Sequence, residues 1–231
     1  MTYALRLLDV KSHCNLTNDA FHQIMTIVNN NNVSLHKATT KLKSLVQIKP
    51  ILIDMCPNSC CAYTGDYKNN NECKYCHTPR FQNATSNHPR CQMAYFSIKD
   101  RLIIQYQDPT RSEELRYRAN YTHHQGFDVD GKIGDIFDGL RYKNLLSNGF
   151  FYDKRDVALI GSVDGYQIFR QKTDDCWIVL MINANICPEN RVKKENLMIT
   201  AIIPGPKEPK FFNSFMYPII KELKELEGTL I

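Results

Sequence analysis

The sequence has no long apolar segment and none of the common nucleotide-binding or hydrolase motifs. No apolar run in its 231 residues approaches the roughly 18–20 residues of a membrane-spanning helix. The opening segment MTYALRLLDV has too short an apolar stretch for a secretory signal peptide. The patterns GxGxxG, GxxxxGK[ST], HExxH and GxSxG are absent, which argues against nucleotide-cofactor enzymes, zincins and serine hydrolases. We therefore expect an intracellular protein that does not cross a membrane.

A modest excess of positive charge allows a polyanionic partner without requiring one. The chain has 29 Lys and Arg against 24 Asp and Glu, a formal net charge of +5. The basic residues are concentrated in two segments, 141–155 and 191–210. Charge alone does not distinguish phosphate contacts from solvated loops in these segments.

Hydrophobic periodicity predicts helices in the first half of the chain and strands followed by a helix in the last third. Apolar residues recur at helical spacing over 15–46, which predicts two helices, and again over 96–119. Ser34 can cap the second of the first two helices. From residue 157, the runs VALIGSVDGYQIF, CWIVLMINANI and NLMITAIIP predict three strands with connections short enough for antiparallel neighbours. An amphipathic helix is expected over 212–227.

These patterns divide the chain into four regions of an α+β protein. We expect a helical N-terminal region at 1–49, a small loop-rich module at 50–95, a helix and Gly-rich linker at 96–150, and a β-β-β-α unit at 151–231. The second region holds six of the nine cysteines, together with Asn, Pro and Gly in place of helical periodicity. The cysteines therefore direct attention to this module.

Four cysteines of the module have the spacing of a tetrahedral zinc site. Cys56-x3-Cys60 and Cys73-x2-Cys76 form two close pairs separated by twelve residues. Each pair can supply two thiolates from one tight turn, as in a zinc ribbon, and metal binding would replace the apolar core that so small a module lacks. Without a secretory signal the thiols stay reduced, which favours metal ligation over disulfides. Four thiolates leave no open coordination position, so the predicted Zn²⁺ is structural.

Two neighbouring residues compete for places in this ligand set. Cys61 is adjacent to Cys60 and could replace it, and His77 could replace a cysteine. We favour Cys60. The remaining cysteines have no partner at metal spacing and are expected in the core or on the surface: Cys14, Cys91, Cys176 and Cys187.

Asp164 interrupts an otherwise apolar strand pattern. An unpaired buried carboxylate would cost several kcal/mol, so we expect Asp164 to be paired, metal-bound or at a sheet edge. Metal-dependent nucleases use such an acid to hold divalent metals. Asp-Gly is also a favoured hairpin turn, so VDGY could reverse the chain instead. Asp135 and Asp138 are weaker candidates in a Gly-rich segment, and Asp174 and Asp175 suit a solvated tip between strands.

Six blocks of sequence occur in order along the chain. They are NLTNDAFHQIM, then IDMCPNSCCAYTG with ECKYCHTPRF, then DIFDGLRY, DVALIGSVDGYQIF, RVKKENLMITAIIPGPKEPK and SFMYPIIKELKELEG. Together they resemble the transposase family of CACTA (En/Spm-like) elements, especially its fungal members. The resemblance covers nearly the whole chain, and its most specific parts are the cysteine module and PGPKEPK with the helix after it.

The resemblance implies a cut-and-paste DNA transposase with an RNase H-like domain, in which two aspartates and a glutamate bind Mg²⁺ or Mn²⁺. Asp164 matches the first aspartate, and residues 212–227 match the first helix of that fold. The other two acids are expected beyond Ile231, so we expect a truncated, catalytically incomplete form with an incomplete RNase H-like β-β-β-α unit. The resemblance also implies transposon-end DNA as the partner, a nuclear location, and self-association into a homo-oligomer.

Two alternatives keep the zinc module without catalysis. One is a non-catalytic DNA-binding or adaptor protein whose zinc module contacts DNA. The other is a zinc-stabilised protein-interaction module with no nucleic-acid partner. Steep salt dependence of DNA binding would distinguish the first from the second, because phosphate neutralisation releases counterions.

Overall fold

The structure of the chain, a computed structural model, consists of two compact units, Met1–Lys49 and Pro50–Ile231. The description covers residues 2–29, 33–46, 48–83, 85–124, 127, 131, 133–167, 175–205 and 207–228. The boundary between the two helices predicted over 15–46 lies partly outside these residues, at 30–32.

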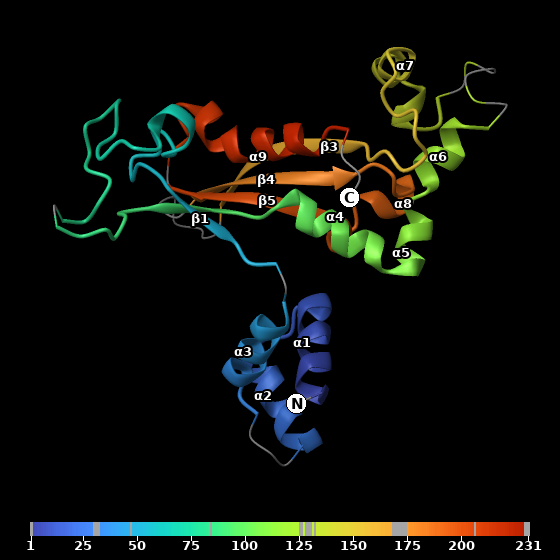
Figure 1. The fold of residues 1–231 in the computed structure, drawn as a ribbon. Coiled ribbons are helices and arrows are strands. Elements are labelled where there is room, and N and C mark those ends of the chain that lie inside the picture. Colours follow the sequence, from blue (N-terminus) through green and yellow to red (C-terminus); the bar gives the residue numbers. More distant parts are fainter. Residues whose placement is uncertain are drawn as a thin grey trace. The chain divides into compact units, whose positions relative to one another are not determined.

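The N-terminal unit contains three short helices that pack together. They are α1 (Thr2–Cys14), α2 (Asn18–Asn29) and α3 (Leu35–Leu45) (Figure 1). The Ser34 hydroxyl accepts a hydrogen bond from the backbone N–H of Lys37 at 3.2 Å, which confirms the predicted cap of α3. The helical pattern over 15–46 is confirmed, whereas α1 was not predicted. The buried core of the unit is Ala4, Phe21, Met25 and Ala38.

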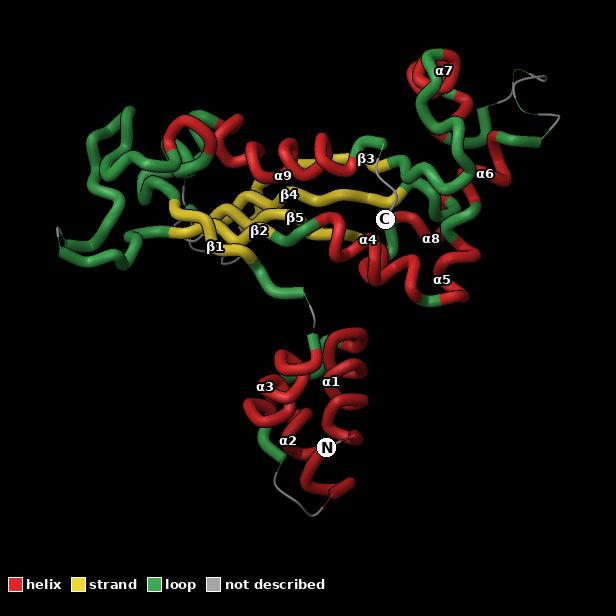
Figure 2. The backbone as a smooth tube through the Cα atoms, in the orientation of Figure 1, coloured by secondary structure: helices red, strands yellow, loops and turns green. Residues whose placement is uncertain are grey.

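The second unit is built on a five-stranded antiparallel sheet (Figure 1, Figure 2). The strands are β1 (Ile51–Asp54), β2 (Gln92–Tyr95), β3 (Leu159–Gln167), β4 (Asp175–Asn183) and β5 (Leu197–Pro204). They lie in the order β1-β2-β5-β4-β3. The three strands predicted from residue 157 are confirmed as β3, β4 and β5, and they are antiparallel neighbours.

The cysteine-containing loop connects β1 and β2, two short strands that the sequence did not reveal. These strands pair with each other along their whole length. β2 then pairs with β5, with Tyr95 opposite Ala201. The loop is therefore inserted between two strands of the same sheet that contains the C-terminal strands.

The second unit contains helices in the two predicted helical segments and further short helices that the sequence did not predict. They are α4 (Ile98–Gln107), α5 (Pro109–Glu114), α6 (Tyr117–Thr122), α7 (Leu140–Ser147), α8 (Pro188–Arg191) and α9 (Phe212–Leu226), with 3-10 turns η1 (Gly65–Tyr67), η2 (Ile136–Asp138) and η3 (Lys194–Asn196). The pattern over 96–119 corresponds to α4, α5 and the start of α6, and the helix expected at 212–227 is α9. The α+β class is confirmed.

The main core lies between the sheet and the helices α4 and α9. At its edge the Glu222 carboxylate of α9 accepts hydrogen bonds from Ser97 Oγ at 2.6 Å and from the backbone N–H of Ile98 at 2.8 Å. This contact places a negative charge at the N-terminus of α4, where the helix dipole favours it. The buried residues of the core include Met93, Leu102, Val179, Ala201, Ile203, Phe215 and Ile219.

Buried arginines organise the part of the unit where α6, α7 and α8 lie. Arg118 is fully buried and donates hydrogen bonds to the backbone carbonyls of Phe151, Asp153 and Asp156 at 3.2, 2.7 and 3.0 Å. Arg191 forms a two-pronged ion pair with Asp135, both bonds being 2.8 Å. We call the surroundings of Arg118, Asp135 and Arg191 the arginine end.

Candidate metal centre

Two tight turns bring the cysteine pairs together. In the first, the backbone N–H of Ser59 donates to the carbonyl of Cys56 at 2.9 Å. In the second, the backbone N–H of His77 donates to the carbonyl of Cys73 at 2.8 Å. Ser59 and His77 both have a φ of 55°, in the left-handed region that closes such turns. Each turn thereby directs two neighbouring thiols to one side.

The four sulfurs of Cys56, Cys60, Cys73 and Cys76 lie within 4.8 Å of one another, and the group could hold a metal ion. The first three side chains are fully buried, and that of Cys76 is partly exposed. Cys61 is also buried, with its sulfur 3.9 Å from that of Cys73, but it does not belong to the group of four. The geometry therefore favours Cys60 over Cys61 as the fourth ligand.

His77 points to a different partner. Its Nδ1 lies 3.4 Å from a carboxylate oxygen of Glu72, and both side chains are largely exposed. Among the described residues, the group of four cysteines does not include His77 or any of the four isolated cysteines. The other cysteines are exposed, partly buried or buried elsewhere: Cys14, Cys91, Cys176 and Cys187.

The electrostatics of the site suit a bound cation. Burial, together with nearby thiols, raises the pKa of the Cys56 thiol to about 11 and that of Cys61 to about 12, and it raises the pKa of Cys60 well above its usual value. Burial acts on Cys76 too, but hydrogen bonds involving Thr78 and Asn58 lower the pKa of its thiol to about 5. A coordinated cation would stabilise all four thiolates, since metal binding displaces the thiol protons.

Nearby donors fit sulfur atoms that carry negative charge. The backbone N–H of Tyr75 donates to the sulfur of Cys73 at 3.4 Å. The side-chain amide of Asn58 donates to the sulfur of Cys76 at 3.5 Å, and the Thr78 hydroxyl lies 3.2 Å from the same atom. Such contacts orient metal ligands and tune their basicity. Nothing in the cysteine spacing identified Asn58 or Thr78.

The cysteine loop is also bonded to the beginning of α9. The backbone N–H of Phe211 donates to the carbonyl of Cys60 at 2.8 Å, and that of Lys210 donates to the carbonyl of Ser59 at 3.0 Å. The backbone N–H of Ala62 donates to the Ser214 hydroxyl at 2.9 Å. These three bonds join segments about 150 residues apart in the sequence. The conformation of the cysteine loop and that of the start of α9 therefore depend on each other.

Gly205 makes the closest approach to the loop. Its φ is 143°, a conformation that other residues rarely adopt, and a Cβ at this position would overlap the hydroxyl of Ser59. Gly205 belongs to the segment PGPKEPK, one of the most specific parts of the family resemblance. The structure shows why a glycine stands in this segment.

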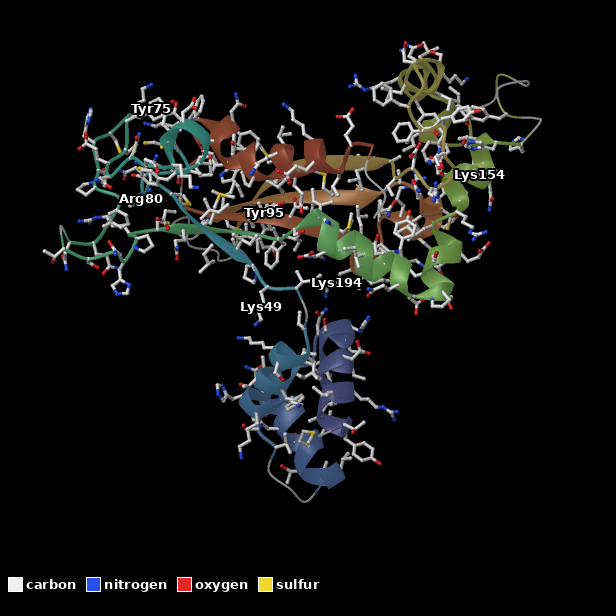
Figure 3. The ribbon with its side chains drawn as sticks, viewed as in Figure 1. Lys49, Tyr75, Arg80, Tyr95, Lys154 and Lys194 are labelled. Atoms are coloured by element: carbon white, nitrogen blue, oxygen red, sulfur yellow. The ribbon has the colours of Figure 1, made fainter. Side chains whose placement is uncertain are left out.

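Arg80 fastens the far side of the loop to β1. Its guanidinium bonds the Asp54 carboxylate at 2.7 Å and the carbonyl of Lys68 at 2.7 Å. It also lies over the ring of Tyr63, 4.7 Å from the centroid. Figure 3 shows where Arg80 lies in the second unit. Sequence reasoning missed Arg80, because no spacing rule connects it with its partners.

Asp164 lies within β3, at the edge of the sheet. It is paired with Ile178 of β4, and Gly165 is paired with Trp177, so the strand continues through both residues. The alternative in which VDGY forms a hairpin turn is therefore wrong. The residue after Ile178, Val179, is buried in the core. Successive residues of a strand point to opposite faces of the sheet, so Ile178 and its partner Asp164 belong to the face opposite that core. Its side chain is exposed, and no burial penalty arises.

The weaker acidic candidates have structural surroundings. Asp135 caps η2 and is paired with Arg191. Burial raises the pKa of Asp135, but hydrogen bonds, above all those from Arg191, lower it below its usual value. Asp138 accepts hydrogen bonds from the Tyr121 hydroxyl at 2.6 Å and from two backbone N–H groups. Asp174 lies outside the described residues, and Asp175 begins β4.

The fold and the sulfur cluster define an α+β protein with a four-cysteine site that could hold a metal ion. Residues 130–229 match a family model described as transposase family tnp2. This match supports a transposase-related protein, and it covers β3, β4, β5 and α9. No curated protein and no solved structure matches the chain. None of the helices in the described part is long and apolar enough to cross a membrane.

Proposed function

We propose that this chain is a transposase-related, DNA-binding protein whose cysteine loop holds one structural Zn²⁺. The observation that carries the proposal is the match to the tnp2 family over residues 130–229. The cysteine loop lies outside that match, yet its backbone is bonded to residues 210–214 within it. The proposed metal therefore supports the part of the chain that resembles a transposase.

The donor set favours zinc over other common metals. Four thiolates are soft ligands, and a tetrahedral group of sulfurs is typical of structural zinc. Cys56, Cys60, Cys73 and Cys76 would occupy all four coordination positions, so no position remains for water or substrate. The burial of three of the four side chains supports the same structural role.

We further propose that the transposase relationship is to the CACTA type, on the resemblance of the six ordered sequence blocks, and that β3, β4, β5 and α9 are part of an RNase H-like domain. A protein of this kind acts on DNA, and we propose a nuclear location for that reason. The antiparallel order of β3, β4 and β5, followed by α9, supports the domain assignment.

Asp164 is proposed as the first carboxylate of a metal-dependent catalytic site. Its exposure on an edge strand leaves it accessible to a divalent ion. A two-metal site needs further carboxylates, however. Among the described residues, no group of three or more candidate ligands includes Asp164. The described residues therefore do not form such a site, and no catalytic step is assigned to them.

This isolation of Asp164 favours a second candidate function, a DNA-binding protein without catalytic activity. Zinc binding and DNA binding are expected for both candidate functions, and only DNA cleavage differs between them. Incubation of the chain with Mg²⁺ or Mn²⁺ and a supercoiled plasmid distinguishes them. Nicking that is lost in Asp164→Asn supports catalysis, and the absence of nicking supports the second function.

DNA binding itself is tested with the full zinc-loaded chain and labelled DNA at several salt concentrations. We expect binding whose logarithmic affinity falls linearly with the logarithm of salt concentration, because each neutralised phosphate releases counterions. Binding that is absent at low salt, or insensitive to salt, would reject the proposed DNA partner.

A further inference from the structure

Tyr67, Lys74, Tyr75 and Phe211 lie together beside the metal centre as a partly exposed aromatic and cationic surface, and Lys210 precedes Phe211 in the chain. The rings of Tyr67 and Tyr75 lie 5.6 and 5.9 Å from the ring of Phe211, measured between centroids. The Lys74 ammonium lies 5.7 Å from the centroid of Tyr67. Lys74 and Lys210 are exposed, and Tyr75 is 44% exposed. We call Tyr67, Lys74, Tyr75, Lys210 and Phe211 the knuckle face.

The metal centre fixes the position of this surface. Lys74 and Tyr75 are the two residues between Cys73 and Cys76, so both lie on one of the two ligand-bearing turns. The backbone N–H of Tyr75 donates to the sulfur of Cys73. On the other side, the backbone of Phe211 is bonded to the carbonyl of Cys60. Both halves of the knuckle face are therefore held by backbone bonds to metal-ligand residues.

The composition of the knuckle face fits a nucleic-acid strand. Partly exposed aromatic rings provide stacking surfaces for bases, and adjacent ammonium groups contact phosphates. The acids near this surface are Glu72, whose carboxylate lies 3.4 Å from Nδ1 of His77, and the exposed Asp66 and Glu208. A surface of aromatic residues and lysines suits a polyanion with planar groups better than a neutral or basic protein partner.

We infer that the knuckle face binds DNA with unpaired bases, with one base stacked on Tyr75 and the adjoining phosphates against Lys74 and Lys210. This inference rests on the proposed DNA-binding function and specifies where the DNA lies. Stacking on a side chain requires an unpaired base, so single-stranded DNA is bound in preference to a duplex. Since the metal centre holds the surface in place, binding also depends on bound zinc.

The test compares oligothymidine with a duplex of the same length, using the full zinc-loaded chain. Tyr75→Ala should lower the affinity for oligothymidine by about tenfold or more, because a base loses its stacking partner. Tyr75→Phe keeps the ring and should bind within about twofold of the original protein. Lys74→Gln should weaken binding and reduce the salt dependence by about 0.7 in the slope of log affinity against log salt.

The arginine end offers a matched control. Tyr152 and Lys154 are another exposed tyrosine and lysine in one short loop, and Lys154 lies at the opposite end of the unit from Tyr75 (Figure 3). Tyr152→Ala should leave the affinity for oligothymidine unchanged. Zinc content and thermal unfolding verify the fold of each variant, and Tyr75→Leu replaces Tyr75→Ala if the latter loses zinc.

The outcomes separate this inference from the proposed function. Loss of binding in Tyr75→Ala with zinc retained, and not in Tyr152→Ala, supports the knuckle face. If Tyr75→Ala and Tyr75→Leu bind like the original protein, the knuckle face is rejected while DNA binding stands. If the original protein binds neither DNA, both are rejected. Equal losses for duplex and oligothymidine in Tyr75→Ala would reject the preference for unpaired bases.

Discussion

The cysteine loop and the arginine end, at the two ends of the second unit, are held together by different interactions (Figure 1). Both contain irregular segments between their regular elements. The cysteine loop gathers four thiols around a single point. The arginine end instead uses fully buried Arg118, which bonds three backbone carbonyls, and the buried pair of Asp135 and Arg191. Under the proposed function one end depends on a metal ion, whereas the other depends on buried charged side chains and on the aromatic cluster around Phe137 and Tyr142. Different treatments should therefore disrupt each of them.

The largest effect is expected from removing a metal ligand. Structural zinc contributes about 10–16 kcal/mol of apparent binding free energy, so Cys73→Ser should lose the ion and lower the melting temperature more than any variant below. Elemental analysis and thermal unfolding measure both quantities. Cys14→Ser, at an exposed cysteine of the other unit, is the control and should change neither. Retention of one zinc per chain in Cys73→Ser would contradict the four-cysteine assignment.

The next largest effect is expected at the arginine end. Asp135→Ala leaves the Arg191 charge buried without its partner, which should lower the free energy of unfolding by about 3–5 kcal/mol. Urea denaturation measures this change. Asp153→Ala removes an exposed pair with Arg155 and should lower the free energy of unfolding much less, because solvent screens exposed charges. Equal losses in the two variants would show that burial of the Asp135 pair has no special role.

The buried pair also predicts a dependence on pH. Although burial raises the pKa of Asp135, its hydrogen bonds with Arg191 and Ile136 bring it below its usual value in the folded protein. The pair therefore stabilises the fold above the unfolded pKa of about 3.9 and ceases to do so as pH falls through the lower folded pKa. The stability difference between the original protein and Asp135→Ala should shrink in that acidic range. A difference that stays constant to the acid limit would contradict the pair as its source.

A smaller effect is expected where the segment before α9 meets the cysteine loop. Gly205→Ala should destabilise the protein by about 1–3 kcal/mol, because of its φ of 143° and the overlap with the Ser59 hydroxyl. Gly149→Ala has a positive φ of 86° and open space around it, so it isolates the backbone contribution. Adding Ser59→Ala to Gly205→Ala should recover part of the loss. No recovery would mean that overlap with Ser59 is not the cause.

The smallest effect is expected at the edge of the sheet. Asp164→Asn should change the free energy of unfolding by no more than about 0.5 kcal/mol, because the side chain is exposed. Chemical denaturation measures the change. A loss of several times this size would show that Asp164 has a structural partner. A negligible change would leave any effect of this variant on DNA cleavage attributable to chemistry.

The sequence predicted those parts of the fold whose signal is local. The strands β3, β4 and β5 and the helix α9 have long apolar patterns, and the paired spacing of the cysteines predicts the four whose sulfurs lie together. The choice between Cys60 and Cys61 depended on which sulfur each turn directs inward, which spacing alone does not determine. Zinc itself stays a prediction.

Other features depend on partners distant in the sequence. The strands β1 and β2 have four residues each, and β2 joins the sheet through Tyr95 opposite Ala201, more than a hundred residues away. The sequence offers Asp135 only as a weaker candidate in a Gly-rich segment, because its partner Arg191 lies 56 positions later. Arg118 donates hydrogen bonds to backbone carbonyls. Every residue has such a carbonyl, so the sequence does not single out these partners. Tertiary contacts of this kind leave no periodic pattern to read.

The central claim is that Cys56, Cys60, Cys73 and Cys76 hold one structural zinc, with Cys61 beside them as a bystander. The most direct test measures zinc per chain in the original protein, in Cys60→Ser and in Cys61→Ser after identical purification. We predict about one zinc per chain in the original protein and in Cys61→Ser, and little in Cys60→Ser. Zinc-free original protein, or loss of zinc in Cys61→Ser with retention in Cys60→Ser, would contradict the claim.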